Sequence, residues 1–311
     1  MALHPVIKTM LEAIRQSGRP HLSDGSPDDA RALVAAGRQA LGSGPAVGAK
    51  SEVAIATRNG SIPGRLYRPV EPESGLIIFL HGGGWVVGAL DDFDAMARVL
   101  AVRSGCALLM VDYRLAPEHP FPAGLHDAED AIRWSAAHCV DLAGRTVPIV
   151  VAGDSAGANL AAVAALALRG EVKLALQLLF YPVTDCNTDT SSYRSFGSDY
   201  PLTQKDMKWF FTQYSVEHPM TDPRIAPLRT IDLAGAPPAW IATAEYDVLR
   251  DEGEAFARRL SEAGVSVHLH RYVGMPHGFA RMMNLVDIAD QALNDATAAI
   301  VRACGVPKEL M

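Results

Sequence analysis

Residues 153–157 carry the strongest chemical signal in this sequence. They read Gly-Asp-Ser-Ala-Gly and fit the pattern G-x-S-x-G. The apolar run Val147 to Val151 precedes them and an alanine-rich segment follows, which predicts a strand, a sharp turn and a helix. A glycine on each side lets such a turn hold the serine in a strained conformation with its hydroxyl exposed. We therefore predict that Ser155 is a nucleophile; the alternative is that it only caps a helix.

A serine nucleophile needs a general base and a carboxylate that fixes the tautomer of this base. His277 follows the predicted strand 265–271, and Asp247 follows the predicted strand 239–243. Open α/β sheets place their sites at the carboxyl ends of strands, where Ser155 also lies. We predict that His277 is the base and Asp247 its partner. Other acidic residues compete with Asp247, and we expect the last two of them to face solvent or cap the next helix: Glu245, Asp251 and Glu252.

A glycine-rich segment, His81-Gly-Gly-Gly84, follows the predicted strand 76–80. Without side chains, its backbone N–H groups can point into a cavity, as the stabilisation of a tetrahedral oxyanion requires. We predict that Gly83, Gly84 and Ala156 donate to such an oxyanion. The alternative is a flexible glycine turn. The order of serine, aspartate and histidine along the chain is that of α/β-hydrolases.

Three aromatic residues are candidates for a substrate pocket: Trp85, Phe210 and Phe211. Aromatic residues at helical spacing more often serve packing, so both interpretations stay open. His81 has no partner at the spacing of a metal site, and no phosphate-binding or dinucleotide-binding motif is found. We expect neither a metal nor an organic cofactor.

These residues need a sheet to hold them together. A hairpin around Asn59-Gly60 supplies two predicted strands, and six short apolar runs alternate with helical segments, as in the βα units of a parallel sheet. The sequence thus predicts an α/β fold with eight mostly parallel strands, at residues 53–57, 62–67, 76–80, 107–111, 147–151, 174–180, 239–243 and 265–271. Predicted helices cover residues 3–14, 28–41, 92–104, 126–138, 156–169, 203–214 and 251–263. The long interval between Phe180 and Ala239 indicates an insertion over the carboxyl edge of the sheet.

The composition excludes several classes of protein. The chain has 311 residues, 49 % of them hydrophobic, and a formal net charge of −7, without the basic surface that nucleic acids require. Its N-terminal apolar residues have helical spacing rather than the pattern of a signal peptide, and its apolar runs are shorter than the roughly 18 residues of a membrane span. We expect a cytoplasmic protein without membrane insertion. Four cysteines have no ligand spacing and are expected to be unpaired: Cys106, Cys139, Cys186 and Cys304.

Six motifs together resemble the bacterial hormone-sensitive-lipase-like family of carboxylesterases. They lie at residues 81–85, 112–123, 153–157, 222–224, 245–252 and 277–279, in the order of the family. The resemblance implies an α/β-hydrolase core at residues 46–185 and 221–311. It also implies a discontinuous helical cap, at residues 1–45 and 186–220, and the hydrolysis of esters with short to medium acyl chains.

Several alternatives stay open. The same triad can cleave amides or long-chain lipids, and plant gibberellin receptors, which resemble this family, bind ligands on the same fold without catalysis. The exposed edge predicted at residues 265–271 makes a homodimer plausible. In the proline-rich loop after residue 111, we expect Arg114 and Glu118 to pair with each other.

Overall fold

The computed structural model describes residues 2–70 and 74–305. Its centre is one sheet of eight strands with the order β1-β2-β4-β3-β5-β6-β7-β8. The strands are β1 (Ala49–Thr57), β2 (Gly60–Arg68), β3 (Leu76–Leu80), β4 (Ala107–Val111), β5 (Ile149–Asp154), β6 (Leu174–Phe180), β7 (Ala239–Tyr246) and β8 (Val267–Pro276). Only the pairs β1–β2 and β2–β4 are antiparallel. All eight predicted strands are confirmed.

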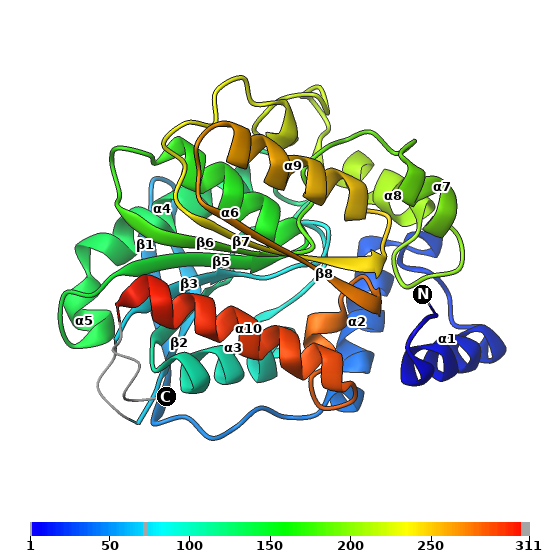
Figure 1. Cartoon of the computed structure of the whole chain (residues 1–311), viewed down its shortest axis with the longest axis horizontal. Coiled ribbons are helices and arrows are strands. Elements are labelled where there is room, and N and C mark those ends of the chain that lie inside the picture. Colours follow the sequence, from blue (N-terminus) through cyan, green and yellow to red (C-terminus); the bar gives the residue numbers. More distant parts are fainter. Residues whose placement is uncertain (1, 71–73, 306–311) are drawn as a thin grey trace.

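Helices cover both faces of the sheet (Figure 1). On one face lie α4 (Ala123–Ala137), α6 (Ala156–Ala167) and α9 (Arg250–Glu262), and on the other lie α3 (Leu90–Ser104) and α10 (Asp287–Cys304). Each layer buries its own apolar cluster against the sheet. Strands β3 to β5 are buried on both faces and contain almost only apolar residues, as expected for the centre of a parallel sheet.

Three helices were not predicted from the sequence: α5 (Cys139–Ala143), α7 (Ser191–Phe196) and α10. The first two are too short for a periodic pattern to stand out. The long helix α10 was detectable, because its buried residues recur every three or four positions: Ala289, Ala292, Leu293, Ala296 and Ile300.

Helices from two separate parts of the chain gather at the carboxyl edge of the sheet, at the right of Figure 1. They are α1 (Pro5–Ser17), the short 3₁₀ turn η1 (Leu22–Asp24) and α2 (Pro27–Leu41) from the N-terminal arm, with α7 and α8 (Gln204–Tyr214) from the insertion. Ser23 of η1 donates from its N–H and its hydroxyl to Asp206 of α8, at 3.1 and 2.7 Å. Distant parts of the sequence are thus joined over the sheet, which favours the predicted cap.

The proline-rich loop after β4 differs from expectation. Arg114 does not pair with Glu118; its guanidinium binds Asp127 of α4 at 2.7 Å. Glu118 instead accepts two hydrogen bonds from Arg31 of α2, at 2.6 and 2.8 Å. Arg31 also donates to the carbonyl of Val86, two residues after the glycine-rich segment, at 3.0 Å. The prediction of an internal pair was wrong because it considered only partners close in sequence, whereas the arm brings a cation from outside the loop.

Candidate functional site

Ser155 lies in the sharp turn between β5 and α6. Its φ of 54° and ψ of −118° confirm a strained backbone. A side chain on Gly153 would come within 2.5 Å of the Gly157 backbone. A side chain on Gly157 would collide with the carbonyl oxygen of Leu80 on the neighbouring strand. Both glycines are therefore required by close approach of the backbone, as predicted for this turn.

The structure brings Ser155, His277 and Asp247 together. His277 Nε2 lies 2.9 Å from Ser155 Oγ, and His277 Nδ1 lies 2.8 Å from Asp247 Oδ2. With its proton on Nδ1, the imidazole donates to the carboxylate and accepts from the serine hydroxyl. Asp247 is 1 % exposed, and its second oxygen accepts the N–H of Leu249 at 3.0 Å. This arrangement can deprotonate a serine.

The other acidic candidates lie elsewhere in hydrogen-bond networks. Glu245 accepts the N–H of Gly274 at 2.8 Å, and Asp251 accepts that of Ser192 at 2.8 Å. Glu252 was expected at the surface or at a helix cap, but it is only 2 % exposed. Its Oε1 accepts the N–H of Thr184 at 2.7 Å and that of Asp185 at 3.1 Å. Glu252 thus ties α9 to the segment after β6, a contact that sequence spacing does not reveal.

Two external hydrogen bonds and one internal bond hold the glycine-rich segment. Tyr113 donates its hydroxyl to the carbonyl of His81 at 2.7 Å, and His81 Nδ1 lies 2.7 Å from the carbonyl of Gly82. The N–H of Gly82 donates to Asp154 Oδ1 at 2.7 Å. Because Asp154 immediately precedes Ser155, this bond couples the glycine-rich segment to the nucleophile turn.

Three backbone amides near Ser155 have no partner in the described part of the chain. Within residues 2–70 and 74–305, the N–H groups of Gly83, Gly84 and Ala156 donate no hydrogen bond to other residues. Gly83 and Gly84 also have positive φ values of 120° and 58°. Unpaired amides at the start of a helix and in a fixed loop suit the binding of an anionic oxygen.

The three aromatic candidates are buried where the cap meets the core. Trp85 stacks on Tyr214 of α8 with ring centroids 4.3 Å apart, and it lies 5.9 Å from Phe211. Phe210 lies directly against Gly84, because a side chain on this glycine would collide with its ring. Trp85 and Phe211 therefore contribute to packing between α8 and the glycine-rich segment. Phe210 packs against Gly84, whose N–H is one of the unpaired amides, so contact with a substrate is the stronger expectation there.

Tyr181 was missed by the sequence reasoning. It is one of three non-glycine residues with positive φ among those described, and the other two are Ser155 and Trp85. Its ring centroid lies 4.7 Å from that of His277, so it supports one face of the imidazole. Strained backbone is concentrated at functional sites. No sequence motif marks this position, whose N–H donates to the carbonyl of Ala242 on β7 at 2.6 Å.

Asp154 is the most perturbed carboxyl group close to Ser155. Burial raises its pKa from 3.8 to about 6, and the positive charge of Arg281 and the Gly82 N–H oppose this rise. Burial also lowers the pKa of His81, which lies between the rings of Phe93 and Tyr113. His81 is therefore neutral at pH 7 and supports the glycine-rich segment by hydrogen bonding rather than by charge.

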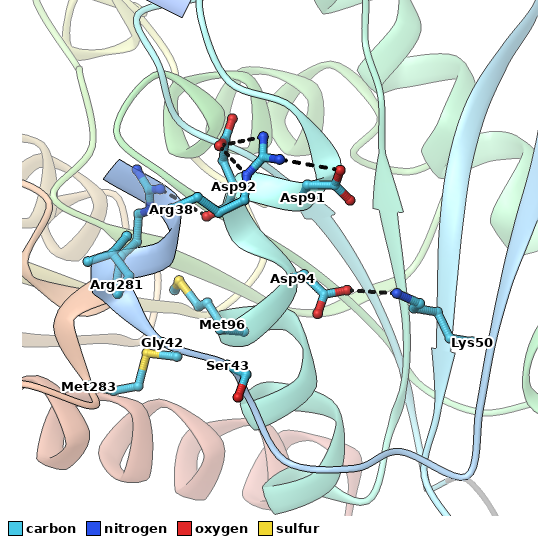
Figure 2. A pocket seen from close by; sticks show the side chains of 12 residues that line it. Arg38, Gly42, Ser43, Lys50, Asp91, Asp92, Asp94, Met96, Arg281 and Met283 are labelled. Atoms are coloured by element: carbon cyan, nitrogen blue, oxygen red, sulfur yellow. Dashed lines mark hydrogen bonds and ion pairs between the residues drawn. The ribbon is translucent and has the colours of Figure 1, made fainter. Parts of the chain in front are cut away.

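A polar pocket of about 320 Å³ lies between α2, the start of α3 and the segment after His277. Figure 2 shows its ion pairs: Arg38 with Asp91 and Asp92, and Lys50 with Asp94. Its lining includes none of the residues 155, 247 and 277. The acidic groups of this pocket are matched by neighbouring cations, and it is separate from the site around Ser155.

Two further searches cover the described residues. They contain no cluster of three or more His, Cys, Asp or Glu side chains that can hold a metal ion. In the same part of the chain, no helix has the length and apolar character needed to cross a bilayer.

A family model and several known proteins match most of this chain. Residues 77–281 match the family model described as alpha/beta hydrolase fold. The chain is 40 % identical to carboxylic ester hydrolase LipN of Mycobacterium tuberculosis over 80 % of this chain and 69 % of that protein. It is 39 % identical to ethyl acetate hydrolase of Pseudomonas putida, over 78 % of this chain and 79 % of the relative.

Solved structures are similar over nearly the whole chain. A hyperthermophilic esterase from the archaeon Pyrobaculum calidifontis superposes with a TM-score of 0.92 at 35 % identity, covering 97 % of this chain and 99 % of the other. An ester hydrolase from the metagenome of Lake Arreo gives a TM-score of 0.92 at 35 % identity over 98 % of this chain and 100 % of its own. The chain therefore belongs to the hormone-sensitive-lipase-like family of carboxylesterases within the α/β-hydrolase superfamily.

Proposed function

We propose that this protein hydrolyses carboxylic esters of short to medium acyl chain through an acyl-enzyme on Ser155. The observation that carries the proposal is the continuous hydrogen-bonded series from Asp247 through His277 to Ser155 Oγ. The names of its relatives, which include carboxylesterase and ethyl acetate hydrolase, support the same reaction.

The geometry assigns each group a step. His277 Nε2 takes the proton of Ser155 as Oγ attacks the ester carbonyl, and Asp247 stabilises the resulting imidazolium. The carbonyl oxygen becomes an oxyanion and binds the N–H groups of Gly83, Gly84 and Ala156. His277 then returns the proton to the leaving alcohol. A water molecule repeats these steps on the acyl-enzyme and releases the acid.

Ser155→Ala tests this mechanism. We expect turnover of p-nitrophenyl butyrate to fall by about 10⁴-fold or more, because the attacking oxygen is lost while the oxyanion amides remain. The thermal unfolding midpoint should change little.

Labelling with a fluorophosphonate distinguishes the alternatives: the wild type should react at Ser155, and the variant should not. Retained hydrolysis in Ser155→Ala would refute the assignment. A wild type that binds small acids but never reacts at Ser155 would favour the receptor alternative.

Phe210 supports the assignment of short to medium acyl chains. It is 2 % exposed and covers Gly84, so its ring limits the space beside the oxyanion. We expect Phe210→Ala to raise kcat/KM for p-nitrophenyl octanoate relative to butyrate by about tenfold, as removal of several buried carbons from a pocket allows. Thr212→Ala, an exposed position on the same helix, is the control and should leave the ratio unchanged. A long-chain lipid hydrolase would instead prefer p-nitrophenyl palmitate to butyrate in its wild-type form.

Strand β8 supports a homodimer. It forms one edge of the sheet, and its residues 268–271 are exposed, Leu269 to 39 %. An exposed edge strand can pair with the same edge of a second copy around a twofold axis. Light scattering after size-exclusion chromatography tests this: we expect a dimer in the wild type and a monomer in Leu269→Lys. A monomeric wild type at micromolar concentration would contradict it.

A further inference from the structure

Two of the four cysteines lie together at the opposite edge of the sheet from Ser155. Cys106 immediately precedes β4, and Cys304 is the last residue of α10. A side chain on Gly75 would come within 2.5 Å of Cys304 Sγ and 2.8 Å of Cys106 Sγ, so both sulfurs border the same small space. Residues 198 positions apart in sequence thus meet at their sulfur atoms.

The surroundings of the pair favour thiolate chemistry. The neighbouring Cys304 thiol is the largest cause that lowers the pKa of Cys106, from 9.0 to about 7, whereas Cys106 and burial raise the pKa of Cys304, so the first proton leaves from Cys106. The Ser74 hydroxyl lies 3.7 Å from Cys106 Sγ and assists. Thiolates, rather than thiols, attack disulfides, so a pair that shares one proton near neutral pH is reactive.

Access to the two sulfurs differs. Cys106 is fully buried, whereas Cys304 is partly exposed. An external oxidant can therefore reach Cys304, and Cys106 is placed to attack from inside. This division between an accessible and a resolving cysteine is typical of reversible redox sites.

We propose that Cys106 and Cys304 form a reversible disulfide that fastens the C-terminal helix to the central sheet. Cys106 starts as the thiolate, having lost its proton to water. Cys304 Sγ passes its proton to Cys106 as it attacks one sulfur of a low-molecular-weight disulfide; the S–S bond of that disulfide breaks, and the departing thiolate takes a proton from water. Cys106 Sγ then attacks Cys304 Sγ in the mixed disulfide, the bond to the small sulfur breaks, and the second thiol leaves with the proton of Cys106. The protein loses two protons and two electrons, and the small disulfide gains them.

The bond should stabilise the fold without changing catalysis. A cross-link between distant positions restricts the unfolded chain, and the cost of closing a loop grows with its length. Helix α10 packs against α3 and three strands, so fixing its end opposes the separation of this layer. The pair lies at the amino edge of the sheet, whereas Ser155, Asp247 and His277 follow the carboxyl ends of strands. We therefore expect unchanged kcat and KM.

The test uses the full chain incubated with oxidised glutathione, then alkylated and measured by intact mass and peptide mapping. We expect two of the four thiols to be lost, one intramolecular peptide linking residues 106 and 304, and an unfolding midpoint raised by about 5 °C. Dithiothreitol should reverse these changes.

Cys304→Ser should abolish both the disulfide and the rise in the unfolding midpoint. Cys186→Ser should retain both; Cys186 is a partly exposed cysteine in the insertion and serves as the control. Cys106→Ser can disturb the core because this side chain is fully buried, so the conclusion depends on the Cys304 variant. A mixed glutathione adduct that never resolves, a link between two chains, loss of two thiols in Cys304→Ser, or an unchanged midpoint would overturn the proposal. None of these outcomes depends on ester hydrolysis.

Discussion

The core fixes its part of the site through hydrogen bonds, whereas the cap meets the site mainly through aromatic packing. Ser155 and His277 are joined at 2.9 Å, and Asp154 holds the glycine-rich segment through a 2.7 Å bond. From the cap, Tyr214 stacks on Trp85 and Phe210 covers Gly84. Hydrogen bonds set angles and distances closely, whereas packing tolerates changes of shape. The chemistry should thus depend sharply on core residues, and substrate choice on cap residues.

Asp247→Asn tests the core side of this comparison and has the largest expected effect. The amide cannot hold His277 in the tautomer that accepts from Ser155, so kcat should fall by about 10⁴-fold. Glu245→Gln, two residues earlier, is the matched control and should retain activity within about threefold, since Glu245 bonds a backbone amide instead. Steady-state kinetics on p-nitrophenyl butyrate measure both. Equal losses in the two variants would show that the loop as a whole, rather than Asp247, matters.

Gly84→Ala tests the boundary between core and cap. The added methyl group collides with Phe210, and it places a side chain on a residue with positive φ. Both effects should displace the Gly84 N–H that binds the oxyanion, so kcat should fall by about 100-fold. Removing the collision in the double variant Gly84→Ala/Phe210→Ala should restore part of this loss. No recovery would mean that backbone strain dominates and that the cap does not press on the glycine-rich segment.

Asp154→Asn measures what the core loses in stability by burying a charge beside Ser155. Below pH 3.8 the carboxyl group is neutral in both the folded and the unfolded chain. In the folded chain the pKa of Asp154 is raised to about 6. The free energy of unfolding therefore falls as the pH rises from about 4 to 6, and it stays at the lower value above pH 6. This loss in the free energy of unfolding is on the order of 2 to 3 kcal/mol. The Asp154→Asn variant avoids it because an asparagine side chain carries no charge at any of these pH values.

We therefore expect Asp154→Asn to raise the unfolding midpoint more at pH 8 than at pH 4. Asp222→Asn is a control of opposite sign, because a hydrogen bond from Arg224 lowers the pKa of Asp222. The stability of the Asp222→Asn variant relative to wild type should fall as the pH rises through the acidic range, because only the wild type gains the interaction of an ionised Asp222. Thermal melts across this range measure both variants, and a pH-independent gain in Asp154→Asn would contradict a buried charge.

Ser23→Ala tests how the two parts of the cap are joined and has the smallest expected effect. It removes the hydroxyl donor to the buried carboxylate of Asp206 but leaves the backbone donor. The loss should be about 1 kcal/mol, seen as a slightly lower unfolding midpoint. Lys205→Met removes an exposed ion pair with Asp24 and should have no measurable effect. If both variants behave alike, the contact between arm and insertion does not stabilise the cap.

The sequence determined the order of the strands along the chain and the residues at their ends, because these depend on local patterns. Apolar runs mark buried strands, and glycines next to Ser155 mark a turn that tolerates no side chain. The strand ranges 76–80, 107–111 and 174–180 agree with the structure residue by residue. Once parallel strands are assumed, the meeting of Ser155, Asp247 and His277 at one edge follows from their positions after strands.

Only the tertiary structure decided the contacts between segments far apart in sequence. Glu118 pairs with Arg31 of the N-terminal arm, whereas the sequence had predicted a pair with Arg114. Glu252 is buried and accepts a hydrogen bond from the segment after β6. The strain at Tyr181 and the meeting of Cys106 with Cys304 likewise have no local signal. The packing of whole helices and strands decides which residues become neighbours in these cases. The interactions of a charge, an aromatic ring or a sulfur atom depend on those neighbours and not on the adjacent residues in the sequence.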